Sequence, residues 1–142
     1  LGAILGGASP EMESGLAGYG MHLGTAFQII DDVLDYSGAE AETGKHLGDD
    51  LAEGKPTLPL IHVMQHGLPE QAALVRSAIE RGGRDDFPAV LAAVRASGAL
   101  DHARKAAEAE AQRAAEMISA LPPSQYKESL LQLCAFAVSR SF

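Results

Sequence analysis

The sequence has little of what several classes of protein need. Cys134 is the one cysteine, which excludes an internal disulfide framework and a cysteine-based zinc site. Tryptophan is absent and aromatic residues make up 5% of the chain, which argues against a base-stacking platform for nucleic acid. No apolar run reaches the roughly 18 residues of a membrane-spanning helix, and no charged leader precedes an apolar stretch. We therefore expect no membrane span and no signal peptide, and the single cysteine suits a reducing, cytoplasmic location.

The charge balance is acidic. The 142 residues include 19 Asp or Glu and 11 Lys or Arg, for a formal net charge of −8, and the basic residues form no stripe. Such a surface repels a phosphate backbone, so no nucleic-acid partner is expected. Hydrophobic residues make up 46% of the chain, which is enough to bury a core and excludes intrinsic disorder.

Helical patterning covers almost the whole chain, with abundant Gly and Ala and no strand-type alternation. Ser9-Pro10 predicts a helix start, because serine caps the first turn and proline suits its first position. Residues 1–8 are expected to be the end of a packed helix, stopped by Gly6-Gly7, and residues 38–56 a polar loop. The other expected helices span residues 11–36, 57–66, 69–81, 87–96, 100–121 and 124–140. The sequence thus predicts an all-α fold, with residues 1–142 in one domain.

Three aspartates interrupt the otherwise apolar helix of residues 11–36. At ~100° per residue, Gly24, Gln28, Asp31 and Asp35 fall within about 60° of one another. The first 44 residues contain no Lys or Arg to offset the buried charge. Oxygen ligands favour a hard ion, and Mg²⁺ binds through carboxylates, waters and a substrate's phosphates. The cluster therefore predicts the floor of a diphosphate site, with a merely solvated acidic face as the alternative.

The segment 43–59 carries two basic residues, Lys45 and Lys55, and each follows a glycine. Glycine lets the backbone approach a ligand closely, and a lysine ammonium is a compact charge suited to a phosphate oxygen. Asp50 is expected to hold one of these lysines in place. The alternative is a pair of ordinary surface lysines.

Other patterns indicate structural roles. An EF-hand, a Walker loop and a di-iron bundle all fail on spacing. His62 and His66 lie one helical turn apart, but Val63 stands where a zinc protease has glutamate, so structural or surface roles are expected. The Ala/Glu run of residues 103–116 is expected to pack on one side only. Cys134 is expected in the core.

Together the motifs resemble the trans-polyprenyl diphosphate synthases. The pattern is Gly24-x-x-Phe27-Gln28-x-x-Asp31-Asp32-x-x-Asp35, then Gly44-Lys45, Gly48-x-Asp50-Leu51 and Gly54-Lys55-x-Thr57-x-Pro59. It is similar to the family's second aspartate-rich motif and the loop behind it, and most similar to the long-chain, octaprenyl-type branch. The family's first aspartate-rich motif, its basic pocket for isopentenyl diphosphate and a Lys-Thr pair precede this region and are not found here. The chain is therefore expected to be the C-terminal part of a single polyprenyl synthetase domain.

This resemblance implies an isoprenoid synthase helical bundle, usually a homodimer, that joins isopentenyl diphosphate to an allylic prenyl diphosphate. The octaprenyl-type product would supply quinone side chains. Mg²⁺ would be held directly by Asp31, with Asp32 and Asp35 ligating or acting through water. The other implied roles are diphosphate contacts for Lys45 and Lys55, places beside the prenyl groups for Phe27 and Gln28, and catalytic roles for Asp31 and Lys45.

A single carboxylate cluster supplies only part of the ligands that several Mg²⁺ ions need. The 142 residues alone are therefore expected to be inactive. Three alternatives stay open: a shorter-chain farnesyl or geranylgeranyl diphosphate synthase, a terpene cyclase, and a non-catalytic helical interaction domain.

Overall fold

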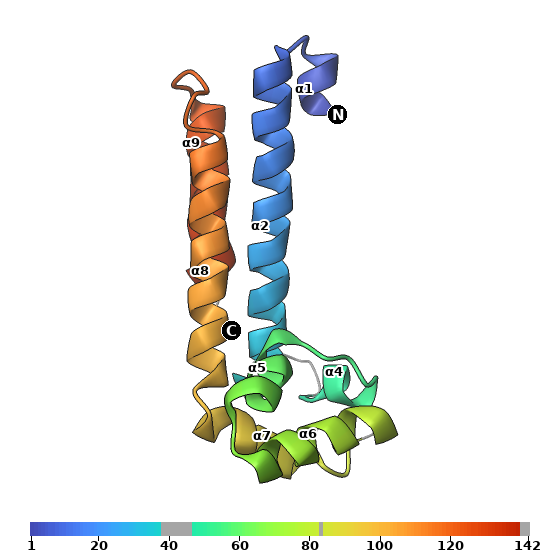
Figure 1. Cartoon of the computed structure of the whole chain (residues 1–142). Helices are drawn as coiled ribbons and strands as arrows, with labels where there is room; N and C mark the ends of the chain where they lie inside the picture. Colours follow the sequence, from blue (N-terminus) through green and yellow to red (C-terminus); the bar gives the residue numbers. More distant parts are fainter. Residues whose placement is uncertain (38–46, 83, 140–142) are drawn as a thin grey trace. The chain divides into compact units, whose positions relative to one another are not determined.

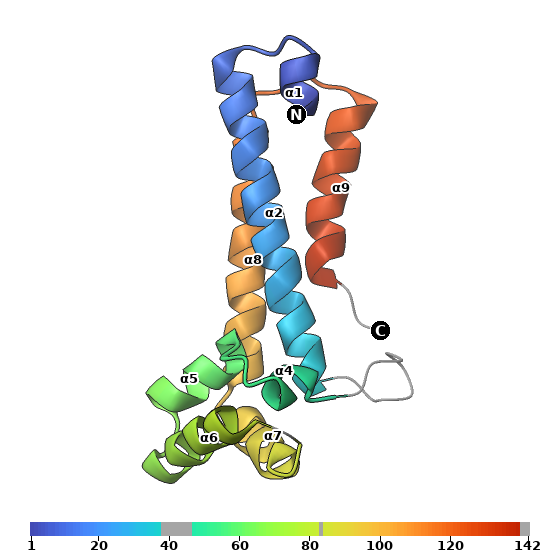
Figure 2. The same cartoon turned by 90° about the vertical axis from the view of Figure 1, so that its right-hand side faces the viewer.

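A computed structural model describes residues 1–37, 47–82 and 84–139, and all regular structure in these ranges is helical (Figures 1 and 2). The all-α prediction is confirmed. The helices are α1 (Gly2–Leu5), α2 (Pro10–Ser37), α4 (Asp49–Ala52), α5 (Leu58–His66), α6 (Pro69–Arg81), α7 (Phe87–Ala96), α8 (Ala99–Met117) and α9 (Gln125–Ser139).

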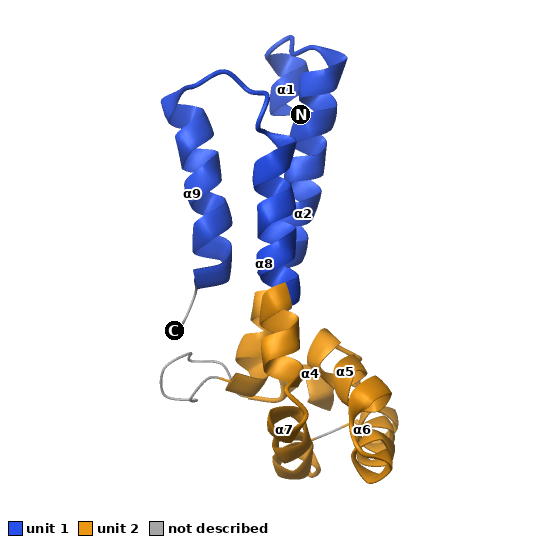
Figure 3. Cartoon of the chain, turned by 60° about the vertical axis from the view of Figure 1, so that its left-hand side comes forward, with its two compact units in different colours: residues 1–28, 106–140 blue, residues 29–105, 141–142 orange. Residues whose placement is uncertain are grey.

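The described residues divide into two compact units (Figure 3). Unit 1 takes residues 1–28 and 106–139, and unit 2 takes residues 29–105. Helices α2 and α8 each contribute one segment to either unit. The prediction of one domain over residues 1–142 stays a prediction.

Unit 1 packs α2, α8 and α9 around a small core. Its buried residues are Tyr19, Ala26, Ala111, Ala114, Ile118 and Cys134. The helices approach closely, because a Cβ added at Gly15 would lie 2.7 Å from the carbonyl oxygen of Met117. The Tyr19 hydroxyl donates a hydrogen bond to the carbonyl of Leu130 at 2.9 Å. Burial of this hydroxyl raises the pKa of Tyr19 to about 12.

Two expectations about buried residues are confirmed, one for Cys134 in unit 1 and one for α8, which has a segment in each unit. Cys134 is buried, and burial raises the pKa of its thiol, which makes it a core residue with little thiolate. The alanine-rich helix α8 packs on one side, with buried alanines three and four positions apart at Ala103, Ala107, Ala111 and Ala114.

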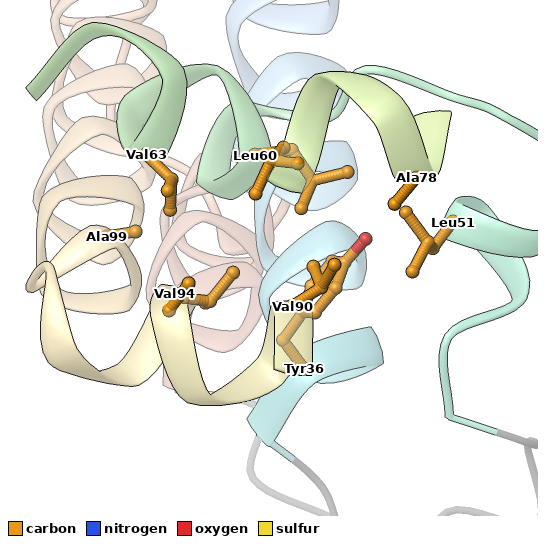
Figure 4. Close-up of a cluster of buried hydrophobic side chains, with 10 residues drawn as sticks. Tyr36, Leu51, Leu60, Val63, Ala78, Val90, Val94 and Ala99 are labelled. Carbon is orange, nitrogen blue, oxygen red and sulfur yellow. The ribbon is translucent and has the colours of Figure 1, made fainter. Parts of the chain in front are cut away.

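Unit 2 surrounds its own apolar core with α4, α5, α6 and α7 and with the adjoining ends of α2 and α8 (Figure 4). The core residues are Tyr36, Leu51, Leu60, Val63, Val75, Ala78, Val90, Ala93, Val94 and Ala99. The ring of Tyr36, at the end of α2, lies 6.1 Å from that of Phe87 at the start of α7. Tyr36 therefore fixes the aspartate-bearing end of α2 to the body of unit 2.

Two of the described helices, α2 and α9, begin at a serine cap. Ser9 is the cap of α2, since its hydroxyl oxygen accepts a hydrogen bond from the backbone N–H of Met12 at 3.3 Å. Ser124 does the same for α9, accepting from Lys127 N–H at 3.2 Å. The predicted start at Ser9-Pro10 is confirmed.

Three boundaries differ from the predictions. The predicted loop of residues 38–56 contains the helical turn α4, and Leu51 of this turn is fully buried, which stabilises it. Helix α1 buries no residue against the described chain, so the expectation of a packed helix over residues 1–8 is wrong there. Helix α8 ends at Met117 rather than residue 121, because Ser119 and Leu121 form tighter turns with Glu116 and Ile118.

None of the described helices combines the length and the apolar composition needed to cross a membrane.

Three histidines from two helices lie together in unit 2. The His62 ring lies 4.8 Å from that of His66 on α5 and 4.5 Å from that of His102 on α8. Nδ1 of His62 is buried without a hydrogen-bond partner in the described residues. Burial lowers the pKa of His62, and the neighbouring His102 and His66 lower it further. Sequence spacing indicates the pair on α5 but not the third ring.

Gly48 should be intolerant of a side chain. Its φ is +81°, and an added Cβ would lie 2.4 Å from the ring of Phe87. Gly48→Ala in the full-length protein should therefore lose about 2 kcal/mol or more of unfolding free energy, from the left-handed backbone and the overpacking together. Urea denaturation measures this loss. Gly20→Ala, where an added Cβ meets nothing in the described chain, is the control, and an equal loss in both variants would contradict the argument.

Acid should weaken the histidine cluster. His62 has a folded pKa below its unfolded value of about 6.5. The stabilisation is thus complete above pH ~6.5 and is lost as pH falls through the lower folded pKa. The thermal midpoint should drop more steeply between pH 7.5 and 5 in the wild type than in His102→Gln, which removes one repelling ring. An equal drop in both proteins would disprove the coupling.

Candidate functional site

The candidate site lies on the C-terminal half of α2. The helix continues without a break to Ser37, so Gln28, Asp31 and Asp35 share one face, as predicted. Asp31 and Asp32 are half-buried, whereas Asp35 is only 7% exposed. Phe27, one turn before Asp31, is 44% exposed.

Asp35 faces the turn that follows the helix. Its Oδ2 accepts a hydrogen bond from the backbone N–H of Asp50 at 3.2 Å, and its backbone carbonyl accepts one from Gly48 N–H at 3.3 Å. Burial raises the pKa of the Asp35 carboxyl, and the nearby Asp50 and Asp49 charges raise it further, against the hydrogen bonds from their backbone. Within the described residues, the buried Asp35 carboxylate is thus satisfied by the backbone N–H of Asp50.

Lys55 is held by the same turn. Its ammonium lies 2.6 Å from Oε2 of Glu53 and 3.5 Å from Oδ1 of Asp50. The hydrogen bond to Glu53 is the main reason why the pKa of Lys55 is raised. The side chain is 55% exposed, so its charge is available to solvent. The prediction that Asp50 holds one of the lysines is confirmed for Lys55.

Glycine makes this placement of Lys55 possible. Gly54 has a φ of +69°, and an added Cβ would lie 2.9 Å from the carbonyl oxygen of Ile79 on α6. Lys55 N–H then donates to the carbonyl of Asp50 at 2.8 Å, and Thr57 N–H donates to that of Lys55 at 3.0 Å. The backbone on both sides of Lys55 is therefore fixed.

Sequence reasoning missed two contacts of the turn. Glu53 is the nearer partner of Lys55, and the spacing of two residues around Gly54 was a usable signal. Asp49 forms an ion pair with Arg84, which precedes α7. No local pattern could have indicated this pair, since it joins residues 35 positions apart.

The structure brings together some of the predicted site residues. Asp35 and Lys55 meet through Asp50, whereas Lys45 lies outside the described residues. Within the described ranges, no three His, Cys, Asp or Glu side chains are grouped so that they could hold a metal ion. Among the three aspartates of α2, Asp31 and Asp32 are half-buried and Asp35 is buried.

Comparison with known proteins decides the family. The sequence profile of the polyprenyl synthetase family matches residues 1–96 of this chain. The chain belongs to the polyprenyl synthetase family. The resemblance inferred from the aspartate and lysine motifs is therefore confirmed.

Relatives of this polyprenyl synthetase chain agree with the assignment. It is 50% identical to an octaprenyl diphosphate synthase of Haemophilus influenzae over 99% of its residues, which is 43% of that protein. A polyprenyl synthase of Caulobacter crescentus, complexed with calcium and isoprenyl diphosphate, superposes with a TM-score of 0.88 at 38% identity, over 98% of this chain and 43% of that one. A geranylgeranyl pyrophosphate synthase of Corynebacterium glutamicum, complexed with isoprenyl diphosphate and magnesium, superposes with a TM-score of 0.82 at 28% identity. The match covers 95% of this chain and 39% of that one. The chain thus spans less than half the length of these relatives.

Proposed function

We propose that this chain supplies the second carboxylate cluster and the lysine turn of an octaprenyl-type trans-prenyltransferase. The enzyme would join isopentenyl diphosphate to an allylic prenyl diphosphate and release diphosphate. One observation carries the proposal. The end of α2 that carries the aspartates is hydrogen-bonded to the turn that carries Lys55. The carboxylates and the lysine are therefore held in connected segments of backbone. The 50% identity to an octaprenyl diphosphate synthase favours this branch.

The carboxylates fit a hard divalent cation. Asp31 and Asp32 offer oxygen ligands only, which is the donor set that Mg²⁺ prefers. Mg²⁺ bound there would neutralise charge that develops on the leaving diphosphate. Two related enzymes were crystallised with isoprenyl diphosphate and a divalent cation, calcium in one and magnesium in the other, which supports the assignment. Because the Asp35 carboxylate is only 7% exposed and faces the turn at Asp50, we assign it no direct metal bond.

The lysines would act on the diphosphate. Breaking the allylic C–O bond leaves an additional negative charge on the diphosphate oxygens, and a nearby ammonium lowers the barrier by stabilising it. Lys55 is fixed for this task by Glu53 and Asp50, and we assign Lys45 the same role. Phe27 and Gln28, one turn before the aspartates, would lie beside the prenyl groups.

The rest of the site would come from chain outside these 142 residues. Since the relatives are more than twice as long, we propose that their remaining part corresponds to the first aspartate-rich motif and the isopentenyl diphosphate pocket. The 142 residues alone would then be inactive. A cytoplasmic homodimer is the assembly that we propose for the whole enzyme.

A shorter product is the second candidate. The match to a geranylgeranyl pyrophosphate synthase at a TM-score of 0.82 favours it, because the same architecture serves both. Product analysis of the full-length enzyme by chain length separates the two.

Asp31→Ala tests the metal assignment. In the full-length enzyme it should reduce turnover by about 100-fold or more, since loss of a direct ligand should cost at least as much as loss of an outer partner. The melting temperature should stay near the wild-type value, because the change also relieves repulsion from Asp35. Steady-state kinetics at saturating magnesium measure turnover. Asp85→Ala, at an exposed carboxylate before α7, is the control, and near-normal turnover of Asp31→Ala would refute the proposed function.

Lys55→Ala and Lys45→Ala test the diphosphate contacts. Loss of a charge-assisted hydrogen bond of about 1.5–3 kcal/mol should raise KM for the allylic diphosphate by about 10-fold or more. Lys105→Ala, at an exposed position on α8, should leave KM unchanged. If all three variants behave alike, the turn does not contact the diphosphate.

A further inference from the structure

Asp35 differs from the two aspartates before it. Asp31 and Asp32 are half-buried, while Asp35 is buried and its Oδ2 accepts the N–H of Asp50 at 3.2 Å. A second bond joins the same two segments, from Gly48 N–H to the backbone carbonyl of Asp35 at 3.3 Å. Residue 35 therefore contacts the turn through both its side chain and its backbone.

Asp50 is hydrogen-bonded both to Asp35 and to Lys55. Its N–H is bound by Asp35, while its carbonyl accepts the N–H of Lys55 at 2.8 Å. Its carboxylate also lies 3.5 Å from the Lys55 ammonium. Two successive hydrogen bonds thus lead from the Asp35 carboxylate to the backbone of the lysine.

The turn is flanked by two glycines in the left-handed region, so its position depends on the hydrogen bonds to residue 35. Gly48 and Gly54, with φ values of +81° and +69°, frame the segment. Between them, α4 is one turn long and has no side-chain cap of its own at Gly48. Such a short helix is not stable by itself. Its position depends on the buried Leu51 and on the bonds from residue 35.

We propose that Asp35 is a positioning residue, which fixes the Asp49–Lys55 turn so that Lys55 presents its ammonium to the diphosphate, rather than a third metal ligand. This inference rests on the proposed function. Asp35 would anchor the turn even with no metal or substrate bound. The two readings of Asp35 also predict different outcomes for an amide side chain, which keeps an oxygen acceptor for Asp50 N–H but is a much poorer metal ligand.

Hydrogen exchange of the full-length protein, without metal or substrate, tests the anchor directly. Peptides covering residues 47–57 should exchange faster in Asp35→Ala than in the wild type. Exchange in Asp35→Asn and in the matched control Asp31→Asn should stay slow in this segment. Wild-type exchange in Asp35→Ala would overturn the proposal.

Kinetics separate positioning from ligation. Asp35→Ala should raise KM for the allylic diphosphate by about 5-fold, the cost of one hydrogen bond, and Asp35→Asn should recover most of that loss. The double variant Asp35→Ala/Lys55→Ala should be within about 2-fold of Lys55→Ala, because the two residues act through one group. If Asp35→Asn instead matches Asp35→Ala and needs more magnesium, Asp35 is a metal ligand and the proposal fails.

The proposed function itself is tested by a different variant, Asp31→Asn. Asp31→Asn should raise the magnesium concentration at half-maximal rate. If Asp31→Asn has normal turnover and magnesium demand, the metal assignment is wrong, while the exchange result for Asp35→Ala still decides whether residue 35 anchors the turn.

Discussion

A buried carboxylate must find hydrogen-bond donors, and at the end of α2 the backbone of the next turn provides them. Asp35 is 7% exposed, and in the described chain its Oδ2 accepts the N–H of Asp50 at 3.2 Å. This hydrogen bond and the burial of Leu51 together hold residues 48–55 against the end of α2. Gly48, whose backbone N–H donates to the carbonyl of Asp35, lies directly against Phe87 in this arrangement.

Charge is distributed around the turn so that its cation is held without being neutralised. Lys55 lies between Glu53 and Asp50, yet its side chain is 55% exposed. Surface ion pairs of this kind stabilise a fold very little. They restrict the rotamers of a long side chain, which under the proposed function would lower the entropy lost when a diphosphate binds. Arg84 pairs with Asp49 on the other side of the turn, so Asp49, Asp50 and Glu53 each contact a cation.

The helices that the sequence predicted best are those with local signals at their ends. Ser9-Pro10 fixes the start of α2, and apolar residues three and four positions apart indicate that the helix continues to near its observed end at Ser37. The face shared by Gln28, Asp31 and Asp35 follows from that period alone. The one-turn helix α4 was missed, because four residues give no periodicity and its stability comes from burial of Leu51 in unit 2. The prediction for residues 1–8 was wrong for the opposite reason: their apolar pattern indicates packing, but the described chain buries none of the residues of α1.

The sequence by itself determined the all-α class and the family resemblance, and it indicated the candidate residues of the site, since these depend on identity and on spacing within one helix or one turn. Only the tertiary structure decided which of the described candidate residues contact one another. The direction in which Asp35 points, the closer pairing of Lys55 with Glu53 and the contact of His102 with His62 depend on segments separated along the chain. Such contacts are selected by the packing of whole helices, which no local pattern encodes.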